Sequence, residues 1–454
     1  MPFDKPIIIL HGWSDKSVSF EPLAAFLRTQ GAEVIDLWLG DYQSMRDRIT
    51  LWDLGLAFRR ALEREQIPLA RYSFDCVIHS TGALVAREFL RQICGGDATL
   101  TPIRNLVMLA PANFGSPLAK VGKSVIGRLF KGWSFDNIAD GAAGETGERV
   151  LDALEMASPY SWQLGLDELT GGSATLFSAE NCRTTVLAGT NKYTGMRGVT
   201  HVNGGDGTVL VSTANLNTRY LLVDFADPDQ PKIIDRKTST SAVAFAVLDR
   251  NHGTITHPDA TREERSLPQV ADWQRLFLAA LQVTQAGYAA HLAVCAGQTV
   301  ATFAAGRGDN FHQYMHVVFK VRDQFGQPVP DYVIDFYQLD DDDRDKVYRK
   351  IHGEVLEKVW TNTRDASYRS FLLDLTDLET FLQRNPEATI ELSVAAANVS
   401  REISYRNPSQ PAKGVRLFSQ QDRNFWHPNE TVLVEFILHR TTTENVFTLR
   451  HPAA

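Results

Sequence analysis

Ser80 stands between a short apolar run and a helical pattern, within the sequence FDCVIHSTGALVARE of residues 74–88. The apolar residues 76–78 predict a buried strand, and a helical pattern begins at Gly82. A serine at such a sharp turn exposes its hydroxyl beside free backbone N–H groups at the positive end of the helix dipole. This hydroxyl can attack a carbonyl group, and the N–H groups can stabilise the oxyanion that forms. We therefore predict that Ser80 is a nucleophile; a serine that only caps the helix is the alternative.

A glycine-rich loop further along the chain, residues 204–209 (GGDGTV), contains an aspartate. A reactive serine needs a base, and the base needs an acid that orients it. Glycines on both sides allow a carboxylate to enter a crowded site, so we predict that Asp206 is this acid. A surface turn or a calcium-binding loop is the alternative, and Asp224 and Asp235 are the substitutes.

The base is expected in the loop DRNHG, which follows the predicted buried strand 242–248. We predict that His252 reaches Ser80 from this loop. His257 lies just before a proline in the same region and is the second candidate. A solvated loop histidine is the alternative for either residue.

Strand-like apolar runs alternate with helical patterns over residues 1–286, which is typical of a mostly parallel sheet covered by helices. The alternation stops over residues 117–179. An insertion of this size at the carboxyl edge of a parallel sheet usually covers the ligand crevice, so we predict a helical lid. Besides the strand before Ser80, the expected strands cover residues 6–10, 33–39, 105–109, 184–188, 220–225 and 242–248, and the expected helices cover 20–30, 51–65, 82–93 and 266–284.

The pattern changes over residues 287–454, where alternating strand-like runs dominate. Such runs occur at residues 317–336, 389–395 and 432–438, and the helical pattern at 375–383 is an exception. This spacing is typical of a β-sandwich, so we predict a separate C-terminal all-β domain.

Length and composition exclude several classes of protein. A chain of 454 residues is long enough for two domains, and its net charge of -8 argues against nucleic acid as the main partner. The sequence contains no run of roughly eighteen apolar residues, so it predicts no membrane span. The four cysteines are scattered, which predicts neither a zinc site nor a disulfide framework. The N-terminal segment lacks the pattern of a secretory signal, so we expect a cytoplasmic protein, with signal-independent export left open.

The motifs HGW, HSTGALVARE, LAPANFGSPLA, GGDGTV and NHG together resemble the lipase branch of the α/β-hydrolases. This branch includes lipases similar to lecithin–cholesterol acyltransferase, the deacylases of inositol lipid anchors and some bacterial phospholipase effectors. The chain order Ser80, Asp206, His252 is that of α/β-hydrolases. The resemblance covers roughly residues 5–285 and implies an α/β-hydrolase fold with these residues as its triad. In one respect the chain departs from the family: Ile78 stands where the usual G-x-S-x-G motif has a glycine.

The resemblance also implies an oxyanion hole and a substrate site. In α/β-hydrolases a turn after the first core strand and the residue after the nucleophile supply the oxyanion N–H groups. The residues at these positions are Trp13 and Thr81. The segment NFGSPL matches the one that opens the lid in these lipases. The residues expected to line the substrate site are His11, Gly12, Phe114 and Phe130.

A basic amphipathic pattern runs through the predicted lid at residues 120–133. Val121, Val125 and Leu129 fall at i, i+4 and i+8, and all the interleaved charges are basic. This pattern favours contact with an anionic membrane surface or with lipid phosphate; a lid helix that packs on the core is the alternative.

Together these features predict a serine carboxylic ester hydrolase that acts on lipid acyl esters through an acyl-enzyme intermediate. The chemistry requires neither a metal nor an organic cofactor. An acyltransferase with the same triad and a non-catalytic binding protein with this fold are the alternatives.

Overall fold

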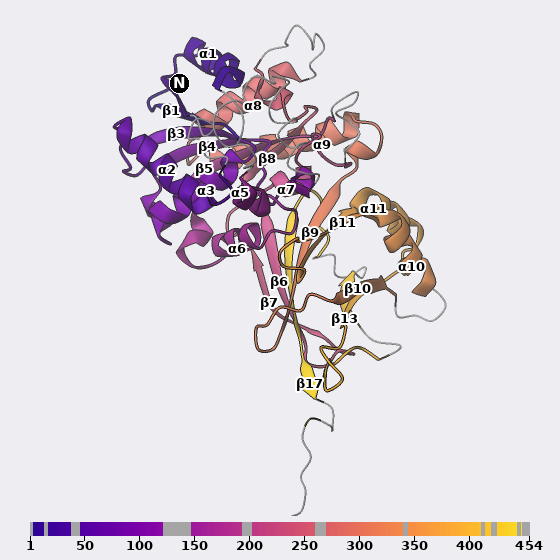
Figure 1. The fold of residues 1–454 in the computed structure, drawn as a ribbon. Coiled ribbons are helices and arrows are strands. Elements are labelled where there is room, and N and C mark those ends of the chain that lie inside the picture. Colours follow the sequence, from indigo (N-terminus) through magenta and orange to yellow (C-terminus); the bar gives the residue numbers. More distant parts are fainter. Residues whose placement is uncertain are drawn as a thin grey trace, which may run out of the picture. The chain divides into compact units, whose positions relative to one another are not determined.

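The computed structural model describes residues 3–12, 17–37, 46–120, 147–192, 202–258, 269–338, 344–409, 414–418, 425–442 and 446. The chain divides into two compact units. Figure 1 shows its fold, coloured along the sequence. The first unit comprises Met1–Thr218, Thr238–Gln313 and Asn429–Thr431, and the second comprises Arg219–Lys237, Tyr314–Pro428 and Val432–Ala454. The chain therefore enters the second unit before it has completed the first.

A six-stranded sheet forms the centre of the first unit, in the order β2-β1-β3-β4-β5-β8 (Figure 1). Every pairing between these strands is parallel. Their sequences are nearly continuous apolar runs because helices cover both faces of the sheet. The strands are β1 (Ile7–Leu10), β2 (Val34–Leu37), β3 (Phe74–His79), β4 (Ile103–Leu109), β5 (Arg183–Gly189) and β8 (Ala244–Leu248).

Successive residues of β1 face opposite sides of this sheet. Ile8 and Leu10 belong to one core cluster with α2, α3 and α5, whereas Ile7 and Ile9 belong to another with α1 and α8. The helices of the unit are α1 (Glu21–Thr29), α2 (Leu51–Arg64), α3 (Gly82–Cys94), α5 (Glu148–Ala153), α6 (Pro159–Glu168), α7 (Val211–Ala214), α8 (Val270–Gln282) and α9 (Tyr288–Ala305). Its 3-10 turns are η1 (Ser17–Phe20), η3 (Ala98–Leu100), η4 (Pro117–Lys120), η6 (Gly171–Thr175), η8 (Thr254–Thr256) and η9 (Asp309–Phe311). Among the described residues, no helix is long and apolar enough to cross a membrane.

Helix α9 lies along β8, the strand at one end of the parallel sheet. The Thr302 hydroxyl donates to the Val247 carbonyl at 2.8 Å, and the Thr299 hydroxyl accepts from the Val247 N–H at 3.1 Å. An uncovered edge strand presents unpaired N–H and C=O groups, so α9 protects this end of the sheet.

The second unit is a β-sandwich. One sheet has the order β11-β12-β9-β16-β6-β7, and the other has the order β10-β13-β15. Apolar residues of both sheets share one core cluster, including Val317 and Phe436 of the larger sheet and Phe336 and Val394 of the smaller. The strands are β6 (Thr218–Phe225), β7 (Lys232–Thr238), β9 (Tyr314–Asp323), β10 (Tyr332–Tyr337), β11 (Leu356–Thr361), β12 (Tyr368–Asp374), β13 (Ile390–Ala396), β15 (Val415–Phe418), β16 (Thr431–Leu438) and the separate pair β14 (Ile403–Tyr405) and β17 (Arg440–Thr442).

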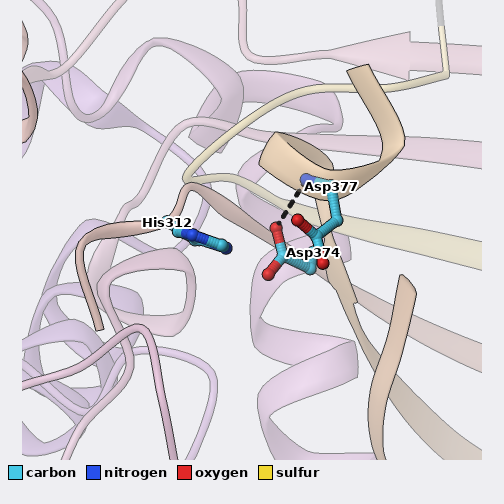
Figure 2. A group of neighbouring side chains, drawn as sticks. All are labelled: His312, Asp374 and Asp377. Carbon is cyan, nitrogen blue, oxygen red and sulfur yellow. Dashed lines mark hydrogen bonds between the residues drawn. The ribbon is translucent and has the colours of Figure 1, made fainter. Parts of the chain in front are cut away.

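In the part of the second unit that the structure describes, two helices accompany the sandwich: α10 (Arg344–Lys350), continued by a π-helical turn at Ile351–Val355, and α11 (Leu375–Arg384). Asp374 caps α11, because its carboxylate accepts the backbone N–H groups of Thr376 at 3.0 Å and Asp377 at 3.1 Å; Figure 2 shows the second of these bonds. Such a cap satisfies N–H groups that have no partner within the helix.

The predicted fold class, a mostly parallel sheet with helices followed by a β-sandwich, is confirmed. Two of the differences from the sequence-based expectation concern the boundary between the units. The strand predicted at 220–225 exists, but it belongs to the sandwich and not to the parallel sheet. Helix α9 was not predicted, and it extends the first unit beyond residue 287. Most of the basic amphipathic segment lies within 121–146, outside the described residues.

Candidate active site

Ser80 occupies the sharp turn between β3 and α3 and adopts a left-handed backbone conformation with a φ of 54°. For a residue with a side chain this conformation costs roughly 1–3 kcal/mol and persists only where its surroundings enforce it. Here the Ser80 N–H donates to the Leu109 carbonyl at 3.1 Å, and the Ser80 carbonyl accepts from Ala83 at 3.1 Å and from Ala112 at 3.2 Å. The neighbouring strand β4 and helix α3 thus hold the strained turn in place.

Two glycines allow the turn to form so close to β1. A Cβ atom on Gly82 would lie 2.9 Å from the Leu10 carbonyl oxygen, which is too close for any side chain. A Cβ atom on Gly12 would lie 3.0 Å from Ser80 Cβ and 3.6 Å from Ser80 Oγ. The predicted HG turn after the first strand therefore packs directly against the serine.

Ile78, which replaces the usual glycine of the motif, does not prevent the turn. Its side chain is fully buried in the same core cluster as Ala83 and Ala112. In the sheet it is paired with Leu10 on one side and Met108 on the other. The branched side chain is thus accommodated as a core residue of β3.

His252 joins Ser80 and Asp206 in one hydrogen-bonded chain. Its Nε2 lies 3.0 Å from Ser80 Oγ, and its Nδ1 lies 2.8 Å from Asp206 Oδ2. All three residues are buried. They follow the carboxyl ends of β3, β5 and β8, the edge at which parallel α/β sheets bind ligands. With the proton on Nδ1 facing the carboxylate, Nε2 can accept the serine proton.

The loop around Asp206 fixes the orientation of its carboxylate. Oδ1 accepts the backbone N–H groups of Thr208 at 2.9 Å and Val209 at 2.7 Å, which leaves Oδ2 for His252. The backbone of His252 also donates to the Asp206 carbonyl at 3.1 Å. Two hydrogen bonds therefore join the loop that contains Asp206 to the loop that contains His252.

The alternative acids and the alternative base are placed elsewhere. Asp224 accepts from His439 Nε2 at 2.8 Å, and Asp235 pairs with Lys237. His257 follows η8, and its carbonyl accepts from Arg250 at 3.1 Å. Burial lowers the pKa of His257, and the charge of Arg250 lowers it further. The structure thus brings Asp206 and His252 to Ser80.

His79 is a further residue of the site, to which the sequence analysis assigned no role. Its Nε2 donates to the His252 carbonyl at 3.1 Å, and the two rings are 4.6 Å apart between centroids. Burial lowers the pKa of His79 well below its usual value, and His252 adds to this effect. His79 therefore supports the base loop as a neutral side chain. In the sequence, only its position next to Ser80 indicated that His79 could belong to the site.

The remaining predicted residues are placed as follows. His11 is buried and stacks on Phe20 with ring centroids 5.7 Å apart. Thr81 is buried at the start of α3. Phe114 is buried with its ring 5.3 Å from the Arg87 guanidinium, and it does not belong to the pocket at Ser80. Trp13 and Phe130 lie outside the described residues.

A small apolar pocket, with room for about one water molecule, adjoins Ser80. Its wall contains Thr81 and Ser116 as polar residues besides the serine. Four other wall residues come from the predicted insertion 117–179, at η4 and around α5. The apolar residues of the wall are Ala112, Leu118, Ala119, Leu151, Leu154 and Val209.

Ion pairs and hydrogen bonds attach the insertion to α3. The Arg87 guanidinium binds both carboxylate oxygens of Glu168 on α6, at 2.8 and 2.7 Å, and donates to the Asn113 carbonyl at 2.6 Å. The Tyr160 hydroxyl donates to Glu88 at 2.7 Å. Since a bidentate pair fixes both distance and orientation, the described part of the insertion is held firmly beside the pocket.

Comparison with solved structures identifies the fold. No protein-family model and no curated protein matches the chain. Two structures of phospholipase PlaB from Legionella pneumophila, one of them in complex with thio-NAD, match with a TM-score of 0.78 and 23% sequence identity. Each match covers 99% of this chain and 97% of that chain. The mature lipase BlEst2 from Bacillus licheniformis matches with a TM-score of 0.36 and 15% identity, over 57% of this chain and 88% of that chain. The chain thus has the α/β-hydrolase fold with a C-terminal β domain, and its fold is similar to that of Legionella PlaB.

Proposed function

We propose that this protein is a serine carboxylic ester hydrolase that acts on lipid acyl esters. The observation that carries the proposal is the hydrogen-bonded chain from Ser80 Oγ through His252 to Asp206. The wall beside Ser80 is mostly apolar, which supports an acyl chain as the group that it contacts. The pocket now holds about one water molecule, so the wall must move apart to admit such a chain. The likeness in fold to a protein named as a phospholipase is consistent with this substrate class.

The reaction would begin when Ser80 Oγ attacks the ester carbonyl carbon. His252 Nε2 takes the serine proton, and the Asp206 carboxylate stabilises the imidazolium that forms. The carbonyl oxygen becomes an oxyanion, for which the Thr81 backbone N–H at the start of α3 is the proposed donor. His252 then returns the proton to the leaving alcohol as the C–O bond breaks, which leaves the acyl group on Ser80.

Water would release the acyl group by the same steps. His252 Nε2 removes a proton from water, and the hydroxide attacks the acyl carbonyl. The tetrahedral intermediate collapses, the fatty acid leaves, and Ser80 Oγ regains its proton from His252. The buried position of the site favours this chemistry, because hydrogen bonds to a developing charge are stronger where water is excluded.

The acyl side of the substrate would lie against the apolar wall. Leu118, Leu151 and Leu154 present hydrocarbon surface next to the nucleophile. Each buried methylene group of an acyl chain contributes about 0.8 kcal/mol of binding free energy. We therefore expect kcat/KM to rise with acyl length over the first few carbons.

A fluorophosphonate probe and short p-nitrophenyl esters test the proposal. The probe should label Ser80, and Ser80→Ala and His252→Ala should lose at least a thousandfold in kcat while they remain folded. His257→Ala is the matched control and should retain activity, because that side chain is not bonded to Ser80. Full rates in the Ser80→Ala and His252→Ala proteins would show that the assignment is wrong.

A further inference from the structure

A basic groove lies between α10 and α11 in the second unit. Its lining contains no residue of the proposed triad. Four cationic side chains and one carboxylate line it, together with the ring of Phe381. Its volume is about 420 Å³, which is within the range of ligand sites. The charged residues that line it are Lys346, Arg349, Lys350, Glu354 and Arg384.

The charges of the groove do not cancel. Four positive side chains and one negative one leave a net of three positive charges, although the whole chain has a net charge of -8. Glu354 pairs with Lys350, and Lys346 donates to the Asn385 side chain. The residues that line the groove are thus net positive, although the four aspartates 340–343 directly precede α10 in the sequence. A net positive lining favours an anionic ligand.

The helices place the cations on one surface. Lys346, Arg349 and Lys350 are spaced i, i+3 and i+4 on α10, so they share one face of that helix. Arg384 stands in the last turn of α11 on the other side of the groove. Like charges at such spacings repel each other, and a bound anion would relieve this repulsion.

Apolar residues of α10, of the π-helical turn that continues it and of α11 anchor the groove to the sandwich. Val347, Ile351, Leu378 and Leu382 are buried in the core of the second unit. The ring of Phe381 on α11 lines the groove together with the cations. Aromatic rings next to lysines and arginines are typical of surfaces that contact the headgroup region of a bilayer.

We propose that this groove binds the phosphate groups of anionic phospholipids and so docks the second unit on a negatively charged lipid surface. The inference deepens the proposed function, because a hydrolase of lipid esters must reach its substrate in a bilayer. Lysines and arginines bind phosphate through charge-assisted hydrogen bonds, and the guanidinium groups of Arg349 and Arg384 can each bind two of its oxygens.

Sedimentation with lipid vesicles tests the docking surface. The full chain would carry Ser80→Ala so that no lipid is consumed, and the vesicles would be pure phosphatidylglycerol or pure phosphatidylcholine. Binding to phosphatidylglycerol alone, weakened by salt, is expected. Each cation near an anionic bilayer strengthens binding roughly fivefold, so Arg349→Glu with Arg384→Glu should weaken it by at least thirtyfold. The matched control is Lys358→Glu with Arg401→Glu, which changes the net charge equally at exposed positions of the same unit.

Several results would overturn the proposal. Equal losses in the groove variant and the control would show that only net charge matters, and no loss in the groove variant would show that the groove is not the site. Binding of inorganic phosphate to the protein, measured by calorimetry, with no binding to either vesicle would indicate a free phosphate instead. If the charge-reversed variant failed to fold, Arg349→Gln with Arg384→Gln would provide the test, with a loss on the order of tenfold or more expected.

The same variants separate this proposal from the proposed function. With Ser80 restored, the groove variant should hydrolyse a soluble p-nitrophenyl ester at the rate of the unaltered protein but lose activity on phosphatidylglycerol vesicles. If the unaltered protein hydrolysed no ester, the proposed function would fail while the vesicle measurement still decided the role of the groove.

Discussion

The substitution Asp206→Asn should abolish most of the activity, because it exchanges donor and acceptor in the hydrogen bond between residue 206 and His252 Nδ1. Oδ1 of Asp206 accepts two backbone N–H groups, at 2.9 and 2.7 Å. The asparagine must keep its oxygen at this position, because an NH₂ group there would leave two buried N–H groups without acceptors, at about 1–3 kcal/mol each. Its NH₂ group would then face His252 Nδ1, where the carboxylate oxygen now lies at 2.8 Å.

This reversal changes the tautomer of the base. Nδ1 of His252 would have to accept a hydrogen bond from the asparagine, so the ring proton would move to Nε2 and face Ser80 Oγ. A protonated Nε2 cannot take the serine proton. In serine hydrolases the loss of this arrangement lowers kcat about 10⁴-fold, which corresponds to about 5.4 kcal/mol in the activation free energy.

The assay is the hydrolysis of a short p-nitrophenyl ester, with thermal unfolding measured on the same samples. Asp224→Asn is the matched control: its carboxylate also binds a histidine, but that histidine is His439. The control should keep the rate of the unaltered protein. If a folded Asp206→Asn protein retained more than a tenth of that rate, the carboxylate would not orient the base.

Three further outcomes follow from the geometry. Gly12→Ala, whose new Cβ would lie 3.0 Å from Ser80 Cβ, should reduce kcat/KM on the short ester at least tenfold while the protein still folds; an unchanged rate would contradict the packing of the turn. Glu168→Ala leaves the Arg87 guanidinium buried without its carboxylate and should lower the free energy of unfolding by about 3 kcal/mol in urea titrations, and a loss below about 1 kcal/mol would refute this role. His79 has its pKa lowered by burial, so only the unfolded chain binds a proton there as the pH falls below 6.5. The free energy of unfolding should therefore fall toward acid pH by about 1 kcal/mol per pH unit until the pKa of the folded state is reached, and His79→Asn should reduce this slope.

Hydrophobic periodicity predicted most elements because their buried faces are apolar. The strand before Ser80 and the helix after it were placed to within a residue or two. Helix α9 was missed because its buried face includes His291, Gln298 and Thr302, so it lacks an apolar stripe. These polar side chains are buried beside the sheet; Thr302, for example, bonds to the edge strand β8. A long-range contact of this kind leaves no mark in local sequence.

Strand pairing was harder to predict than strand identity. The alternation at 220–225 indicated a strand, but nothing local indicates which sheet it joins. Its neighbour in the sandwich, β16, lies more than two hundred positions along the chain. Lys232–Thr238 was missed because it has few apolar residues and an exposed face along its length.

The residues of the candidate site were predicted from their order in the chain and from the residue types at the turns. The contacts between them could not be predicted in this way. The motifs around Ser80, Asp206 and His252 indicated their roles, but the choice between His252 and His257 depended on a short 3-10 turn between them. The support that His79 gives to the base loop depends on packing between β3 and that loop. Such contacts become visible only when the chain is folded.

The path of the chain through β6 and β7 restricts how this protein can be recombined. Because these strands precede β8 in the sequence but pair within the sandwich, a single breakpoint cannot exchange the second unit as a cassette. A chimera cut at residue 287 would retain two strands that fit only their original partners and would lose the helix that shields β8. Successful grafting would require both segments from one donor, so we expect the two units to have been inherited together.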